Sequence, residues 1–106
     1  MQSDMLRFLG LMRRAGKLSV GETGTGQAVR TGKAKLILLA SDASANARDR
    51  AQSFARRANV PLVLLYADKA ALAETLSIAG GSMAAVCDGG FAQALQEKFP
   101  EEMDRL

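Results

Sequence analysis

Histidine and tryptophan are absent from this chain of 106 residues, and cysteine occurs once, as Cys87. Without histidine, the chain cannot build a Ser-His-Asp or Cys-His catalytic arrangement, and it lacks the most common protein metal ligand. A single cysteine forms no internal disulfide, and without histidine it cannot complete a structural zinc site. We therefore expect no metal and no cofactor. Cys87 lies in an apolar segment, which favours a buried, unreactive thiol.

Long apolar runs and aromatic side chains are also scarce. The longest apolar runs, residues 36–40 and 60–67, are far shorter than the roughly 20 residues that cross a membrane. Aromatic residues make up 5% of the chain, so the core must be aliphatic and rich in alanine. No signal peptide is visible in the sequence. These observations predict a cytoplasmic protein with no membrane partner.

Charge is divided unevenly along the chain. Residues 1–57 contain eleven Lys and Arg against four Asp and Glu, whereas residues 58–106 contain three against seven. The net charge of +3 therefore conceals a basic half and an acidic half. This pattern favours a protein that presents one surface to a polyanion, although uneven charge on solvated helices would give the same totals.

Apolar periodicity predicts alternating helices and strands. The predicted helices cover residues 3–15, 24–31, 46–58, 69–77 and 91–98, and the predicted strands cover residues 17–20, 34–40, 61–67 and 82–87. This order predicts the α/β class, as a three-layer α/β/α sandwich with a mixed four-stranded sheet. We expect one domain over residues 1–99 and a flexible tail over residues 100–106, because Pro100 stops the last helix.

The glycine-rich stretch "GETGTGQAVRTGKAKLILLASD" (residues 21–42) raises the question of phosphate binding. A Walker loop has four residues between its glycines, then Lys and Ser or Thr. Both "GLMRRAGKL" and "GQAVRTGKA" have five residues between the glycines and no hydroxyl after the lysine. A dinucleotide-binding fingerprint reads G-x-G-x-x-G, whereas Gly21, Gly24 and Gly26 have the reverse spacing. The sequence therefore argues against both kinds of nucleotide site.

Basic residues flank the predicted turn at the start of this stretch. Lys17 precedes the turn, and Arg30, Lys33 and Lys35 follow it. Backbone N–H groups at the start of a helix bind anions, and glycine allows a ligand to approach closely. Cations beside such a turn suit a phosphodiester backbone. The combination predicts RNA binding; the alternative is a flexible turn with solvated lysines.

Three segments of the chain carry a family resemblance. They are "LGLMRRAGKLSVGE", "AVRTGKAKLILLASDASANARDR" and "ANVPLVLLYADKAAL". They resemble the bacterial YlxQ-like proteins of the kink-turn RNA-binding superfamily of ribosomal proteins (the L-seven-Ae type), over roughly residues 5–95. The resemblance implies an α/β/α sandwich with a mixed four-stranded sheet, no catalysis, and docking onto bent, internally looped RNA.

The first RNA-contact motif of that superfamily is only partly present. The motif has a glycine, a small residue, Asn and Glu, and then a Lys three residues further on. It falls on Gly21, Glu22, Thr23, Gly24 and Gln27, of which only Gly21 matches. Because each base-edge contact contributes about 1–3 kcal/mol of discrimination, the departures predict weak or altered kink-turn recognition.

The second family contact is a loop with an apolar Ile-x-Val tip that packs on a flipped-out nucleotide. It falls on Ile78, Ala79 and Gly80, where Ile78 matches and Gly80 has no side chain. The hydroxyl and amide side chains near the first motif remain able to form hydrogen bonds with RNA. The predicted RNA-binding residues are Lys17, Gly21, Glu22, Thr23, Gly24, Thr25, Gln27, Arg30, Lys33, Ile78, Ala79 and Gly80.

The sequence thus predicts a non-catalytic protein whose partner is structured RNA, at the ribosome or beside other RNA-associated modules, to which related domains are sometimes fused. Two alternatives stay open. The acidic second half and the Arg-rich helix 46–58 would serve a protein-interaction module on the same fold. Asp42 and Asp88 both follow strands and would serve a small-ligand enzyme, although turn or helix capping also explains them.

Overall fold

The computed structural model describes residues 3–78 and 81–106. Within them, helices and strands alternate as the sequence predicts, and each predicted element is present. In chain order they are α1 (Asp4–Arg14), β1 (Leu18–Val20), α2 (Gly21–Arg30), β2 (Leu36–Leu39), α3 (Ala45–Ala58), β3 (Leu62–Leu65), α4 (Lys69–Leu76), β4 (Met83–Val86), α5 (Gly89–Lys98), the 3-10 helix η1 (Pro100–Glu102) and β5 (Met103–Arg105).

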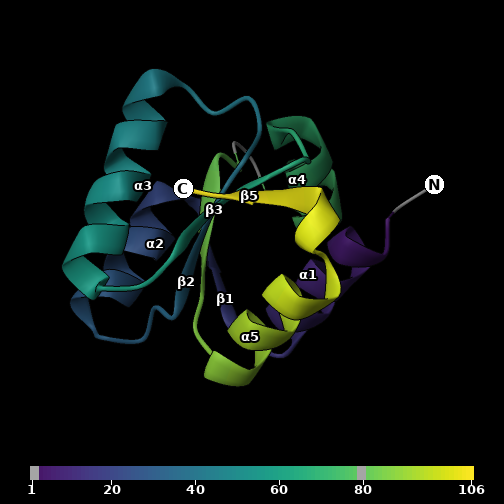
Figure 1. The fold of residues 1–106 in the computed structure, drawn as a ribbon, viewed down its shortest axis with the longest axis horizontal. Coiled ribbons are helices and arrows are strands. Elements are labelled where there is room, and N and C mark those ends of the chain that lie inside the picture. Colours follow the sequence, from purple (N-terminus) through teal and green to yellow (C-terminus); the bar gives the residue numbers. More distant parts are fainter. Residues whose placement is uncertain (1–2, 79–80) are drawn as a thin grey trace.

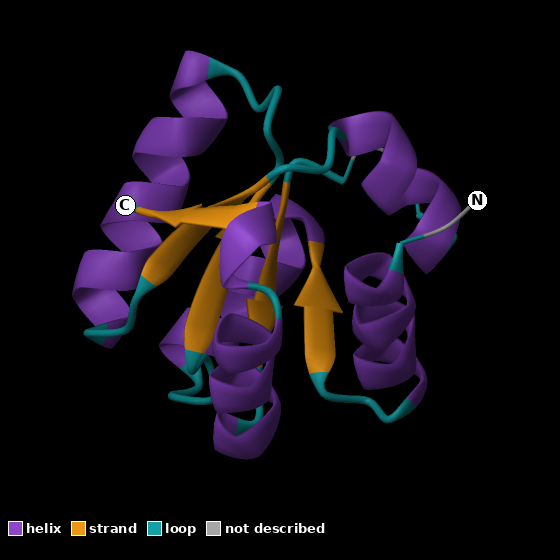
Figure 2. Ribbon diagram, turned by 45° about the vertical axis from the view of Figure 1, so that its right-hand side comes forward, coloured by secondary structure: helices purple, strands orange, loops and turns teal. Residues whose placement is uncertain are grey.

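The strands form one mixed sheet in the order β1-β4-β2-β3-β5, in which only β2 and β3 run parallel. Helices α2 and α3 cover one face, and α1, α4 and α5 cover the other (Figures 1 and 2). The aliphatic side chains that these helices bury form two clusters, one on each face of the sheet. The predicted α/β/α sandwich is confirmed.

The sheet has five strands, so the prediction of four was wrong. Residues 103–105 form β5, which pairs antiparallel with β3 and places Met103 opposite Leu65. Met103 is buried, whereas its two successors in the strand are exposed. In the segment 100–106, predicted as a flexible tail, residues 100–105 therefore form η1 and an edge strand, and the N–H of Leu106 donates to the carbonyl of Leu62. Three residues with a single apolar side chain are too short to give a strand signal in the sequence.

Helix α2 begins at Gly21, three residues earlier than predicted, so the expected glycine-rich turn is helical. Glycine is unfavourable within helices by roughly 1 kcal/mol relative to alanine, which is why residues 21–26 look like a turn. Packing compensates here. A β-carbon at position 26 would lie 3.2 Å from Cζ of Phe54, so Gly26 allows α2 to approach α3 closely.

The two ends of the sheet matter for the site, and we name them after the parallel strands β2 and β3. At the carboxyl end, β2 and β3 stop, β1 stops and β4 begins, because Val20 pairs with Ala84 and Leu39 pairs with Met83. At the amino end, β2 and β3 begin, β1 begins and β4 stops, because Val86 pairs with both Leu18 and Leu36. Helices α2, α3 and α4 each begin at the carboxyl end.

Candidate functional site

The carboxyl end brings together the two segments that the sequence assigns to RNA contact. Gly21 directly follows β1 there, and its φ of +82° turns the chain from the strand into α2. The segment between α4 and β4 reaches the same end, where Ser82 accepts a hydrogen bond of 2.8 Å from the backbone N–H of Ala40. The segments are remote in sequence, and the antiparallel pairing of β1 with β4 makes them neighbours.

The predicted RNA-binding residues of α2 differ in how accessible they are to a partner. Glu22, Thr23 and Gln27 are exposed. Gly24 is half-buried, and a β-carbon there would lie 3.5 Å from the carbonyl carbon of Ser19, so this position faces β1. Thr25 is fully buried, and among the described residues its hydroxyl has no hydrogen-bond partner. Thr25 therefore cannot offer its side chain to RNA, and we leave it out of the interface.

A hollow of about 470 Å³ lies beside the start of α2. Within it, Arg50 of α3 and Glu22 form an ion pair with 2.9 Å between Nε and Oε1. Because the guanidinium of Arg50 partly neutralises the carboxylate of Glu22, Glu22 is less available to other partners. The hollow is lined by Glu22, Ser44, Asn46, Ala47, Arg50, Lys69 and Ser82.

The starts of α3 and α4 at the carboxyl end are already capped, whereas the start of α2 has no side-chain cap. Ser44 accepts a hydrogen bond from the N–H of Ala47, and Asp68 accepts one from the N–H of Ala71. Asp42 accepts one of 2.8 Å from the N–H of Lys69. Side-chain oxygens thus occupy amides that an anion would need, and two of these caps are carboxylates. The start of α3 and the start of α4 are poor phosphate sites.

The predicted phosphate-binding cations lie at the other end of the sheet. The carbonyl oxygen of Lys17 accepts a hydrogen bond of 2.8 Å from the N–H of Cys87, just beyond the end of β4. Lys33 lies in the segment that leads into β2, and Arg30 is the last residue of α2. Helix α2 has ten residues, so its two ends are about 15 Å apart. Lys17, Arg30 and Lys33 therefore do not join Gly21 and Ile78 in one site.

Ile78 is partly buried and packs against the core on the face covered by α1, α4 and α5. A β-carbon at Gly81 would lie 3.0 Å from Cδ1 of Ile78, so this side chain fills the space beside Gly81. The other two predicted loop residues, Ala79 and Gly80, lie outside the described residues. Ile78 anchors the loop to the core in this structure.

Tyr66 is a residue at the carboxyl end that the sequence reasoning missed. It follows β3 directly, and its side chain is 57% exposed. Its hydroxyl donates a hydrogen bond to the carboxylate of Asp104, and this bond raises the pKa of Tyr66 above 10.0, because ionisation would lose it. The sequence does carry a signal for Tyr66. An aromatic residue that directly follows an apolar run is expected where the chain leaves the sheet, at its edge.

The two carboxylates considered for catalysis do not form a pair. Asp42 lies at the carboxyl end, whereas Asp88 lies at the amino end and caps α5 by accepting a hydrogen bond of 2.9 Å from the N–H of Phe91. Both carboxylates therefore act as caps and cannot share one substrate.

Among the residues that the structure describes, no group of three His, Cys, Asp or Glu could hold a metal ion. None of the described helices is long and apolar enough to cross a membrane.

Comparisons with known proteins agree with this architecture. The chain is 32% identical over 94 residues to the RNA-binding protein YlxQ of Enterococcus faecium, with 87% of each chain covered. A solved structure of a protein of unknown function from Bacillus halodurans superposes with a TM-score of 0.80 at 25% identity, covering 91% of this chain and 96% of that one. Residues 3–95 match the family model of the ribosomal protein L7Ae/L30e/S12e/Gadd45 family, and the chain belongs to that family.

Proposed function

We propose that this protein binds structured RNA without catalysis, through the start of α2 and the segment between α4 and β4. The observation that carries the proposal is the meeting of these two segments at the carboxyl end, in a chain of this family with a relative named as RNA-binding. Because the family description includes ribosomal proteins, ribosomal RNA is the first partner to test.

Thr23 and Gln27 are the side chains best placed to read bases. Both are exposed, and they lie four residues apart on α2, so they share one face of the helix. A hydroxyl and an amide can each donate and accept hydrogen bonds, so they can bind base edges without the Asn, Glu and Lys of the family motif. Neutral contacts of this kind are weaker than charged ones, which predicts modest affinity.

The alternative of a small-ligand enzyme loses support, because Asp42 and Asp88 lie at opposite ends of the sheet and serve as caps. Glu22, a further carboxylate at the carboxyl end, is engaged in the ion pair with Arg50. This arrangement presents hydrogen-bonding groups over an open surface, which suits the extended contact that an RNA loop makes.

The proposal is tested by binding of an RNA hairpin with a bent internal loop, compared with a regular RNA duplex of the same length. Gln27→Ala should weaken binding of the looped RNA about fivefold, which corresponds to the loss of one hydrogen bond of about 1 kcal/mol. Gln93→Ala is the matched control, because Gln93 is an exposed glutamine on α5, across the sheet. Equal affinities of the two variants for the looped RNA would contradict the proposed interface.

A further inference from the structure

The amino end of the sheet collects cations from four separate segments. Lys17 precedes β1, Lys33 and Lys35 precede β2, Arg30 is in the last turn of α2, and Arg56 and Arg57 are in the last turn of α3. The hydrogen bond of 2.7 Å from the N–H of Lys35 to the carbonyl of Val86 fixes the second of these segments beside β4. We call this surface the basic end, comprising Lys17, Arg30, Lys33, Lys35, Arg56 and Arg57.

All six side chains are exposed, and none of them forms an ion pair with another described residue. The ion pairs in the described part of the chain join Arg7 to Asp4 and Arg50 to Glu22, which lie in the first halves of their helices. Of the carboxylates on this side, Asp88 serves as the cap of α5, and Glu97 lines the same hollow as Lys35. The cations of the basic end therefore keep most of their charge available to a partner.

Local structure explains only part of this charge. Cations in the last turn of a helix are stabilised by the helix dipole, which accounts for Arg30, Arg56 and Arg57. Lys17 and Lys33 follow the ends of α1 and α2 and donate their backbone N–H groups to carbonyls of those helices, whereas Lys35 lies further from a helix end. Three further exposed ammonium groups, carried by two loops at this end of the sheet, raise the local positive potential, and such a surface attracts polyanions.

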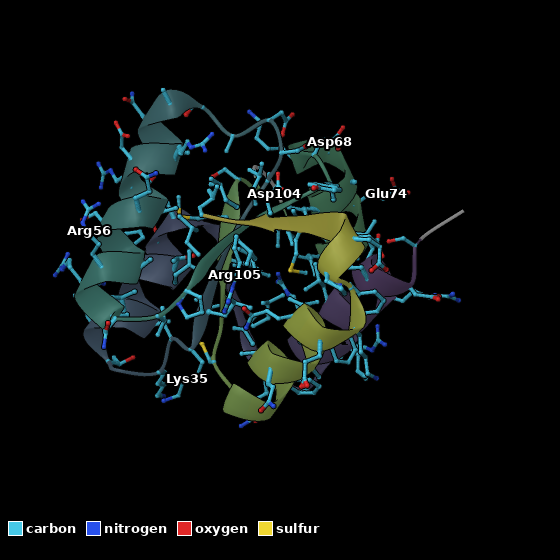
Figure 3. The ribbon with its side chains drawn as sticks, viewed as in Figure 1. Lys35, Arg56, Asp68, Glu74, Asp104 and Arg105 are labelled. Carbon is cyan, nitrogen blue, oxygen red and sulfur yellow. The ribbon has the colours of Figure 1, made fainter. Side chains whose placement is uncertain are left out.

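The carboxyl end has a different character. Asp42, Asp68 and Glu22 lie there together with Arg50 and Lys69, so the charges are mixed, and Figure 3 shows Asp68 at the opposite side of the molecule from Lys35. The length of α2 separates the ends by about 15 Å, which exceeds the Debye length of about 10 Å at 0.1 M salt. At ordinary salt concentrations the two ends therefore act as electrically separate surfaces.

We propose that the basic end binds the phosphate backbone of an RNA helix, as a second contact distinct from the one at the carboxyl end. Lysine is a flexible point charge that suits phosphates without reading sequence. With one surface for a looped segment and one for a regular helix, the protein can join two RNA segments. This inference rests on the proposed function in taking RNA as the partner, but it concerns other residues and another RNA shape.

The test measures binding of a regular RNA duplex, with no loop or bulge, as a function of salt concentration. Lys17→Ala combined with Lys33→Ala should lower the slope of log affinity against log salt by about 2, because each lost phosphate contact removes about one released counterion. Arg48→Ala combined with Lys98→Ala is the control, since both residues are exposed and lie outside the basic end, Arg48 near the start of α3 and Lys98 in the last turn of α5. Each double variant has the same net charge.

The outcomes separate this inference from the proposed function. A shallower slope in the lysine variant with the wild-type slope in the control supports the basic end. Equal slopes in the two variants, or no duplex binding by the unchanged protein, overturn it. The proposed function is decided separately by the looped RNA, which the lysine variant should still prefer over the duplex and which Gln27→Ala should weaken.

Discussion

At the scale of single residues, Thr25 is the clearest conflict between sequence and burial. Its hydroxyl is enclosed and has no hydrogen-bond partner among the described residues, and an unsatisfied buried hydroxyl costs about 1–3 kcal/mol. Thr25→Val keeps the shape of the side chain and removes the hydroxyl. We expect the free energy of unfolding, measured in urea, to rise by about 1 kcal/mol. Thr23→Val, at an exposed position, should change it by less than about 0.5 kcal/mol; a similar rise in both variants would contradict the assignment.

The sequence could not distinguish these two threonines. Both lie within the same glycine-rich stretch, and their burial depends on where α2 begins, because a shift of the start changes which face each residue occupies. Residues with a distinct local role were easier to predict. Capping was one of the two interpretations of Asp42 and Asp88, and both side chains do accept backbone hydrogen bonds at helix starts. A cap such as Asp88 depends on neighbours in sequence, whereas burial depends on the whole packed helix.

At the scale of elements, α2 contains three glycines in ten residues and is held mainly by its neighbours. A β-carbon at Gly24 would make ordinary contact with Ser19, so Gly24→Ala gains helix propensity without a clash. We expect the free energy of unfolding to rise by about 0.5–1 kcal/mol, with unchanged RNA binding, because the new methyl group faces β1. Gly26→Ala should gain less, since its β-carbon would lie 3.2 Å from Phe54. If Gly24→Ala gave no gain, residues 21–24 would form the turn that the sequence suggested.

Elements with a continuous apolar pattern were predicted well, and elements held by distant contacts were not. The run "LILL" gave β2 and the run "LVLL" gave β3, because strands buried by helices on both faces must be apolar throughout. The start of α2 and the strand β5 were missed because their own residues favour a turn and a loop. Gly26 against Phe54, and Met103 against Leu65, supply the contacts that decide these segments.

At the scale of the whole molecule, the charge asymmetry of the sequence has a spatial form that the sequence did not reveal. The basic half of the chain suggested cations around the glycine-rich stretch. The fold instead carries Lys17, Arg30 and Lys33 to the amino end and leaves Gly21 at the carboxyl end. A helix that runs the length of the sheet moves residues near in sequence to opposite surfaces. Only the topology decides which charges gather.

The last strand closes the sheet of the whole molecule, and its contribution can be measured. Met103 is 7% exposed and lies opposite Leu65, so Met103→Ala should lower the free energy of unfolding by about 2–3 kcal/mol through lost burial and the cavity left behind. Glu101→Ala is the control, because Glu101 is exposed and precedes the strand. Urea unfolding followed by circular dichroism measures both. If residues 100–106 were the flexible tail that the sequence predicted, both variants would unfold as the unchanged protein does, and the edge of β3 would be open to solvent.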